Sequence, residues 1–286
     1  MSYKHLRFPG GKPKAVTLSY DDGAKSDIKL AHIINKYGIK CTFNYNNFYN
    51  RPGRLTKEDV IENIISKGHE IAVHGADHKA EGVIRPIEAI EDVLSCRKFL
   101  ENEFDMIIRG MAYPDSGIRF LMPGNTYENI RSCLKNLDIV YARTLNGDNN
   151  SFRLPSDFYA WMPTAHHKNP NIKDYIEQFL SFNYSDKVYS SQKYPRLFYI
   201  WGHSHEFARD DNWSLLEEIC EMLSRKPDIW YATNIEIYNY VTAFGSLEYS
   251  ADGKIVHNPT IYTLWLETEN GQTYSIKSDE TVHLTD

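Results

Sequence analysis

Paired acids follow the first strand-like run of the chain. In SYDDG, Asp21 and Asp22 come directly after the apolar residues 15–20. Adjacent residues at a strand end point in different directions, so one carboxylate could bind a cation while its neighbour acts as a base. The alternative is an ordinary Asp-Gly turn with two solvated acids, and SYDDG taken alone favours that turn.

Two histidines four positions apart form the second group. His74 and His78, in HGADH, follow the strand-like residues 70–73. This spacing places both imidazoles on one face if the backbone turns helically, although an isolated pair favours hydrogen-bonded loop histidines. With Asp22 facing them, they would form a donor set that leaves positions open on a metal ion for water and substrate. We therefore expect one divalent ion, with Zn²⁺ first and Co²⁺, Ni²⁺, Fe²⁺ or Mn²⁺ as alternatives.

A further histidine group suits proton transfer. His203 and His205, in WGHSHEF, follow the strand-like residues 197–201. A histidine at this place could act as a general acid, because its ordinary pKa lies near neutrality. Spacing alone does not choose between the two. His166 and His167, after WMPT, are interpreted as rim or structural residues.

These groups can act together only if the fold brings them to one edge. Short strand-like runs alternate with longer helical patterns, which is typical of βα units around a parallel sheet or barrel, with the active site at the carboxyl ends of the strands. Strands are expected at residues 15–20, 42–46, 70–73, 106–113, 140–143, 160–163, 197–201 and 229–232, before a last helix at 236–244.

The pattern changes near residue 245. Strand-like residues 246–249, 261–267 and 272–276 follow, and the pairs Asp252-Gly253 and Asn270-Gly271 are hairpin signals. We predict an α/β protein with a distorted (β/α) barrel over residues 1–244 and a small antiparallel β appendage over residues 245–286.

Composition excludes several classes of protein. The 286 residues carry a net charge of −6 and have no basic block, which argues against a nucleic-acid partner. No apolar run reaches the ~18 residues of a membrane span, and the first residues lack a signal-peptide core. We expect a cytoplasmic protein without a membrane partner, whose four singly spaced cysteines are buried thiols. The oligomeric state stays open.

Residues 14–244 together resemble the polysaccharide deacetylase family, carbohydrate esterase family 4, whose catalytic domain is a distorted (β/α) barrel. SYDDG is similar to the first motif of that family, and GHEIAVHGADH is similar to the second. The resemblance implies that Asp21 is the catalytic base and that Asp22, His74 and His78 bind the metal. It also favours His203 over His205 as the catalytic acid, because His203 directly follows its strand.

The third and fourth motifs depart from the family pattern. GMAYPDSG has Ala112 where an arginine that braces the base would stand, and Arg143 could reach the base from the next strand instead. Asp157 is the nearest match for the acid that orients the catalytic histidine. The predicted substrate-binding residues are Tyr113, Trp161, Trp201 and Arg143, although each aromatic side chain could equally fill a core.

The resemblance implies a hydrolase that removes an N- or O-acetyl group from a sugar or small glycan. Two alternatives stay open. One is a metal-dependent hydrolase of another non-peptide amide, cyclic amides included, which a panel of small amides would reveal. The other is an inactive carbohydrate-binding protein, which would release no acetate.

Overall fold

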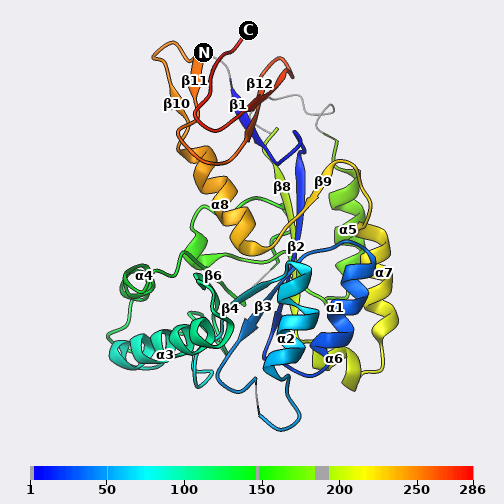
Figure 1. Ribbon diagram of the computed structural model, residues 1–286, viewed down its shortest axis with the longest axis vertical. Helices are drawn as coiled ribbons and strands as arrows, with labels where there is room; N and C mark the ends of the chain where they lie inside the picture. The colour runs from blue at the N-terminus through cyan, green and yellow to red at the C-terminus, as the bar shows by residue number, and fades with distance from the viewer. Residues whose placement is uncertain (1–2, 50, 146–147, 184–192, 286) are drawn as a thin grey trace.

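The computed structural model describes residues 3–49, 51–145, 148–183 and 193–285. A parallel sheet of eight strands forms its centre, in the order β6-β5-β4-β3-β2-β8-β7, with β9 also paired to β2 (Figure 1). The strands are β2 (Lys14–Asp21), β3 (Cys41–Tyr45), β4 (Glu70–Val73), β5 (Gly110–Ala112), β6 (Tyr141–Arg143), β7 (Ala165–His166), β8 (Arg196–Gly202) and β9 (Ile229–Tyr231).

One short segment joins the two edges of this sheet. Trp161 forms a parallel bridge to Arg143 of β6, and its N–H donates to the Ala142 carbonyl at 3.0 Å. Three residues later the Thr164 N–H donates to the Tyr199 carbonyl of β8 at 2.8 Å. The sheet therefore closes into a distorted (β/α) barrel, as predicted. The strand expected at residues 160–163 is wrong in its bounds, because only Trp161 pairs there and β7 begins at Ala165.

Helices cover the outside of the barrel, with α1, α2, α5 and α7 on one side and α3 and α4 on another (Figure 1). The helices are α1 (Asp27–Lys36), α2 (Lys57–Asn63), α3 (Pro86–Phe104), α4 (Tyr127–Asn136), α5 (Ile172–Ser181), α6 (Ser204–Arg209), α7 (Trp213–Leu223) and α8 (Asn234–Gly245), with 3-10 turns η1 (Ile65–Lys67) and η2 (Phe158–Ala160). Because side chains alternate along a strand, Leu18, Phe43 and Ile71 pack outward in the main apolar cluster.

The alternate residues of the same strands point into the barrel, and many are polar. Near the amino ends of the strands, the Glu70 carboxylate accepts hydrogen bonds from Tyr141 Oη at 2.6 Å and Thr42 Oγ1 at 2.7 Å. The Ile235 N–H, in the first turn of α8, donates to it at 2.9 Å. Burial outweighs these donors and raises the pKa of Glu70 to about 7. The start of α8 thus closes this end of the barrel and leaves the other end for the site.

Two small antiparallel sheets complete the structure. One has the order β1-β12-β13 and the other the order β10-β11-β14. Their strands are β1 (Lys4–Arg7), β10 (Glu248–Tyr249), β11 (Ile255–His257), β12 (Leu264–Thr268), β13 (Thr273–Ile276) and β14 (Thr281–His283). The Asp252-Gly253 and Asn270-Gly271 pairs lie between paired strands, which confirms both predicted hairpins.

The first strand of the chain belongs to one of these sheets, which the sequence pattern does not indicate. β1 pairs with β12 in the register Lys4↔Thr268 to Arg7↔Trp265. Leu6 and Leu266 lie in a second apolar cluster with Ile237 and Tyr240 of α8. The domain boundary between residues 244 and 245 stays a prediction. Among the residues that the structure describes, no helix combines the length and apolar character needed to cross a membrane.

Candidate metal and catalytic site

The two acids of SYDDG reach the same end of the barrel through a turn at the end of β2. Asp21 is the last residue of the strand, and its side chain is 1% exposed. Asp22 and Gly23 then take left-handed backbone angles, with φ of 79° and 61°. Aspartate and glycine adopt this region more readily than most residues. The turn therefore lets adjacent carboxylates serve one site.

His74 enters the site from the end of β4 with its ring orientation determined by the neighbouring strand. Its Nδ1 lies 2.9 Å from the Ala112 carbonyl of β5, which can only accept, so Nδ1 carries the proton. The other nitrogen, Nε2, is left to face the two acids. A hydrogen bond of this kind is the usual support of a metal-binding histidine.

His78 lies in a loop, so the two imidazoles do not share the face of a helical turn. Residues 74–80 contain only a bend, and His78 has a φ of 54°. Asp92 of α3 holds this loop, because its Oδ1 accepts from the Asp77 N–H at 2.7 Å and its carbonyl accepts from the Ala76 N–H at 3.2 Å. The loop still places the His78 ring 4.8 Å from the His74 ring.

The predicted metal ligands come together. His78 Nε2 lies 3.4 Å and His74 Nε2 lies 3.7 Å from Asp22 Oδ1, and one ligand atom of each residue lies within 4.8 Å of the others. Bonds of ~2.0–2.1 Å in a tetrahedral site require ligand atoms about 3.3 Å apart. The donor set and its spacing therefore fit one tetrahedral divalent ion with a position left open.

Arg143 braces Asp21 from the end of β6. Ala112 and Arg143 are register partners on β5 and β6, so the small alanine leaves room for the arginine side chain. Arg143 Nη2 lies 2.5 Å from Asp21 Oδ2, and Asn44 Nδ2 donates to Asp21 Oδ1 at 2.8 Å. Burial alone would raise the pKa of Asp21, but Arg143 first, then His74 and His203, hold it below its ordinary value.

His203 faces both acids from the end of β8. Its Nε2 lies 4.0 Å from Asp21 Oδ2 and 3.9 Å from Asp22 Oδ2, while its Nδ1 lies 3.4 Å from Glu206 Oε2. Burial lowers the pKa of His203, but the contact with Glu206 and the charges of Asp21 and Asp22 raise it above its ordinary value overall. His205 is exposed.

The acid beside His203 is Glu206, and Asp157 does not take that place. Asp157 Oδ2 instead accepts from Tyr127 Oη at 2.6 Å and pairs with Arg131 at 3.1 Å. Glu206 lies in the first turn of α6, three residues after His203. An acid three residues after the residue that precedes a helix is a common helix-start pattern, and this pattern could have indicated Glu206 from the sequence.

The predicted substrate-binding residues lie in different surroundings. Trp161 is 1% exposed and packs between Tyr141 and Tyr199, so a sugar contact does not fit its position. Tyr113 is also buried, and its N–H already donates to the Arg143 carbonyl. Arg143 is 0% exposed and serves Asp21. Trp201 is partly exposed beside His203, with ring centroids 5.9 Å apart.

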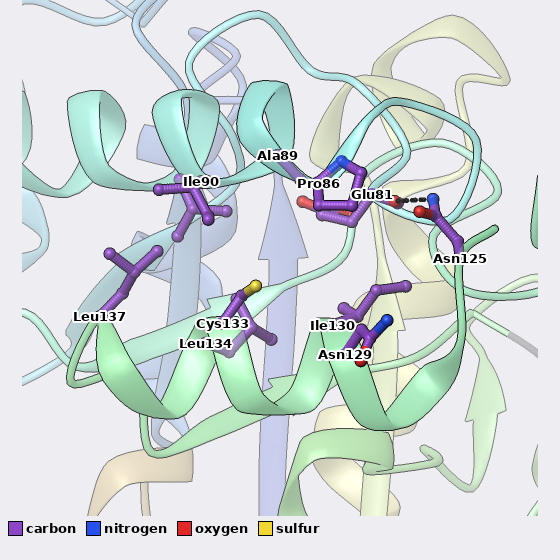
Figure 2. A pocket seen from close by; sticks show the side chains of 11 residues that line it. Glu81, Pro86, Ala89, Ile90, Asn125, Asn129, Ile130, Cys133, Leu134 and Leu137 are labelled. Atoms are coloured by element: carbon purple, nitrogen blue, oxygen red, sulfur yellow. Dashed lines mark hydrogen bonds between the residues drawn. The ribbon is translucent and has the colours of Figure 1, made fainter.

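A separate hollow lies between α3 and α4 (Figure 2). Its lining is mainly apolar and includes Ile90, Ile130 and Leu134, with Glu81 and Asn125 at one end. None of the predicted site residues is among its described lining residues. The predicted metal ligands and catalytic residues therefore lie at the end of the barrel and not in this hollow.

Comparison with known proteins agrees with the fold. Residues 9–142 match the family model described as polysaccharide deacetylase. A search of curated proteins gives no match. A candidate polysaccharide deacetylase from Mycobacterium smegmatis is similar over 86% of this chain and 96% of its own, with 15% identity and a TM-score of 0.56.

A second solved structure has the same fold. It is the Xyl-CE4 domain of a multidomain xylanase from the hindgut metagenome of Trinervitermes trinervoides. The similarity covers 91% of this chain and 100% of that chain, with 15% identity and a TM-score of 0.52. At these identities the two structures support the deacetylase-type barrel and leave the reaction to the site itself.

Proposed function

We propose that the chain is a metal-dependent hydrolase that removes an acetyl group from a carbohydrate. The observation that carries the proposal is the meeting of Asp21, Asp22, His74, His78 and His203 at one end of the barrel. These residues come from β2, the loop after β4 and the end of β8. The family of residues 9–142 supports a carbohydrate as the substrate class.

Asp22, His74 and His78 would hold the ion, and Zn²⁺ suits two imidazoles and one carboxylate best. Bound there, a divalent ion supplies a Lewis acid for the acyl carbonyl and lowers the pKa of water. Asp21 accepts the proton of the attacking water, because Arg143 keeps its carboxylate ionised. His203, whose raised pKa favours the protonated form, gives its proton to the leaving nitrogen or oxygen. Trp201, partly exposed beside His203, is the aromatic side chain that a sugar ring would contact.

The test combines metal analysis with an assay of acetate release. Wild type, Asp22→Ala and His78→Ala are compared for bound metal by elemental analysis and for acetate released from acetylated chito-oligosaccharides. His205→Ala is the matched control, because this histidine is exposed and lies two residues from His203. Each ligand variant should lose one ion per chain and its acetate release, while the control should keep both.

Three results would contradict the proposal in different ways. Bound metal without acetate release, but with turnover of small cyclic or linear amides, would replace the substrate class. Binding of glycans without any turnover would indicate a carbohydrate-binding protein. An unchanged metal content in both ligand variants would overturn the assignment of the ion to Asp22, His74 and His78.

A further inference from the structure

A second group of potential ligands lies on the far side of His203 from Asp22. His166 Nε2 lies 3.1 Å and His167 Nε2 lies 3.5 Å from the same carboxylate oxygen, Glu206 Oε2. One ligand atom of each residue lies within 4.8 Å of the other two. These separations again match the spacing of about 3.3 Å between ligands of a tetrahedral ion with bonds of ~2.0–2.1 Å.

The His167 ring is held rigidly but has no described hydrogen-bond partner. It is 0% exposed, and its ring centroid lies 5.7 Å from that of Tyr20 and 4.1 Å from that of Phe207, with both pairs of rings stacked. Gly202 packs so closely that a Cβ there would fall 1.9 Å from His167 Nδ1. Within the described part of the chain, neither ring nitrogen of His167 makes a hydrogen bond. A buried imidazole in this state is costly unless another group satisfies it.

Glu206 Oε2 has more neighbours than one oxygen can serve by accepting hydrogen bonds. Besides His166 and His167, His203 Nδ1 lies at 3.4 Å and the His203 N–H at 3.3 Å. A carboxylate oxygen offers about two lone-pair positions. The cations Lys168 and Arg209 lie at 3.9 and 3.8 Å from the other oxygen, Oε1, and so leave Oε2 to the imidazoles.

We propose that His166, His167 and Glu206 form a second divalent-metal site, distinct from the site at Asp22, His74 and His78. Two imidazoles and one carboxylate select a borderline first-row ion such as Zn²⁺ or Co²⁺ over Mg²⁺ or Ca²⁺. An ion at this place would satisfy His167 and immobilise the carboxylate that contacts His203. Binding through His166 Nε2 requires the imidazole proton to move to Nδ1, so the hydrogen bond that Nδ1 accepts from the Lys168 N–H at 3.1 Å would be broken. The site does not depend on the deacetylase reaction, since its ligands are separate from those of the first ion.

Metal stoichiometry of the full chain tests this proposal. Protein stripped by a chelator is titrated with Zn²⁺ in a calorimeter, and its metal content is measured after desalting. We expect two ions in wild type, one each in His166→Ala, Glu206→Gln and His78→Ala, and none in the double variant His78→Ala/His166→Ala. His205→Ala, as the control, should keep two. With Co²⁺ in place of Zn²⁺, His78→Ala should show a tetrahedral visible spectrum from the second site alone.

The outcomes separate the two proposals. A wild type with one ion, lost in His78→Ala and kept in His166→Ala, would overturn the second site and leave the proposed reaction standing. Two ions without acetate release would overturn the reaction and support the second site. Unfolding curves of the stripped proteins show whether each variant folds. If His166→Ala does not fold, His166→Gln replaces it, and retention of both ions by a folded His166→Gln would count against the site.

Discussion

The ion pair between Arg143 and Asp21 makes the sharpest energetic prediction. Arg143 is 0% exposed and Asp21 is 1% exposed, and Arg143 Nη2 lies 2.5 Å from Asp21 Oδ2. Arg143→Met keeps much of the side-chain length but leaves the buried carboxylate without its counter-charge. Removing one partner of such a pair costs roughly 3–5 kcal/mol of unfolding free energy.

The pH dependence of this loss has a defined sign. The pKa of Asp21 is lowered in the folded protein from the ordinary value of 3.8. Its pairing therefore contributes stability that is fully present above pH 3.8 and is lost as the pH falls through the lowered value. The difference in unfolding free energy between wild type and Arg143→Met should be largest near neutral pH and should shrink in acid.

Denaturant unfolding of the metal-free proteins measures both effects. Arg131→Met is the matched control, because that arginine is 52% exposed and its pair with Asp157, at 3.1 Å, is a surface contact that should be worth less than about 1 kcal/mol. The double variant Asp21→Asn/Arg143→Met removes both buried charges and should recover part of the loss. A loss no larger than that of Arg131→Met, or no recovery in the double variant, would refute this reasoning.

Three further predictions concern the supports of the site and of the barrel. Asp92→Ala removes the acceptor that holds the Asp77 N–H, so affinity for the first ion should fall about 10- to 100-fold in a chelator competition, whereas exposed Glu91→Ala should leave it unchanged. Burial raises the pKa of Glu70 from 4.5 to about 7 in the folded protein. The unfolding free energy of wild type relative to Glu70→Gln should therefore be highest below pH 4.5 and should fall by up to about 3 kcal/mol as the pH rises through 7. An unfolding free-energy difference that does not change with pH across this range would contradict the raised pKa. Gly202→Ala places a methyl group against His167 and should cost about 1–3 kcal/mol in urea unfolding, while Gly245→Ala, with no atom within 4 Å of the new Cβ, should have little effect.

Local patterns predicted the strands that carry the site because those strands are apolar runs that end in polar residues. The strands expected at residues 15–20 and 70–73 agree within one residue with β2 and β4. The strand expected at residues 106–113 is only Gly110–Ala112, since these three residues are the ones in register with β6. Hydrophobicity marks a buried segment, but the partner strand decides how much of it is a strand.

The contacts of the site were harder to predict than its motifs. Arg143 could be suggested only as a neighbour-strand substitute for the missing arginine at Ala112, and the register of β5 and β6 explains why it reaches Asp21. The family motif points to Asp157 as the acid beside His203, whereas the i, i+3 spacing from His203 points to Glu206, which the structure places there. The buried positions of Trp161 and Tyr113 depend on the closure of the barrel, which no local pattern indicates.

The pairing of β1 with β12 has a consequence for the order of folding. Arg7 and Glu267 form an ion pair at 2.8 Å although 260 positions separate them in the chain. Contacts between such distant segments carry a large loop-closure entropy and form late, so they slow folding. During synthesis, β1 must wait with an unpaired edge until almost the whole chain has emerged, and unpaired edges are sites of aggregation. The yield of folded protein at high expression rates should therefore be sensitive to substitutions in β1, although this strand has only four residues.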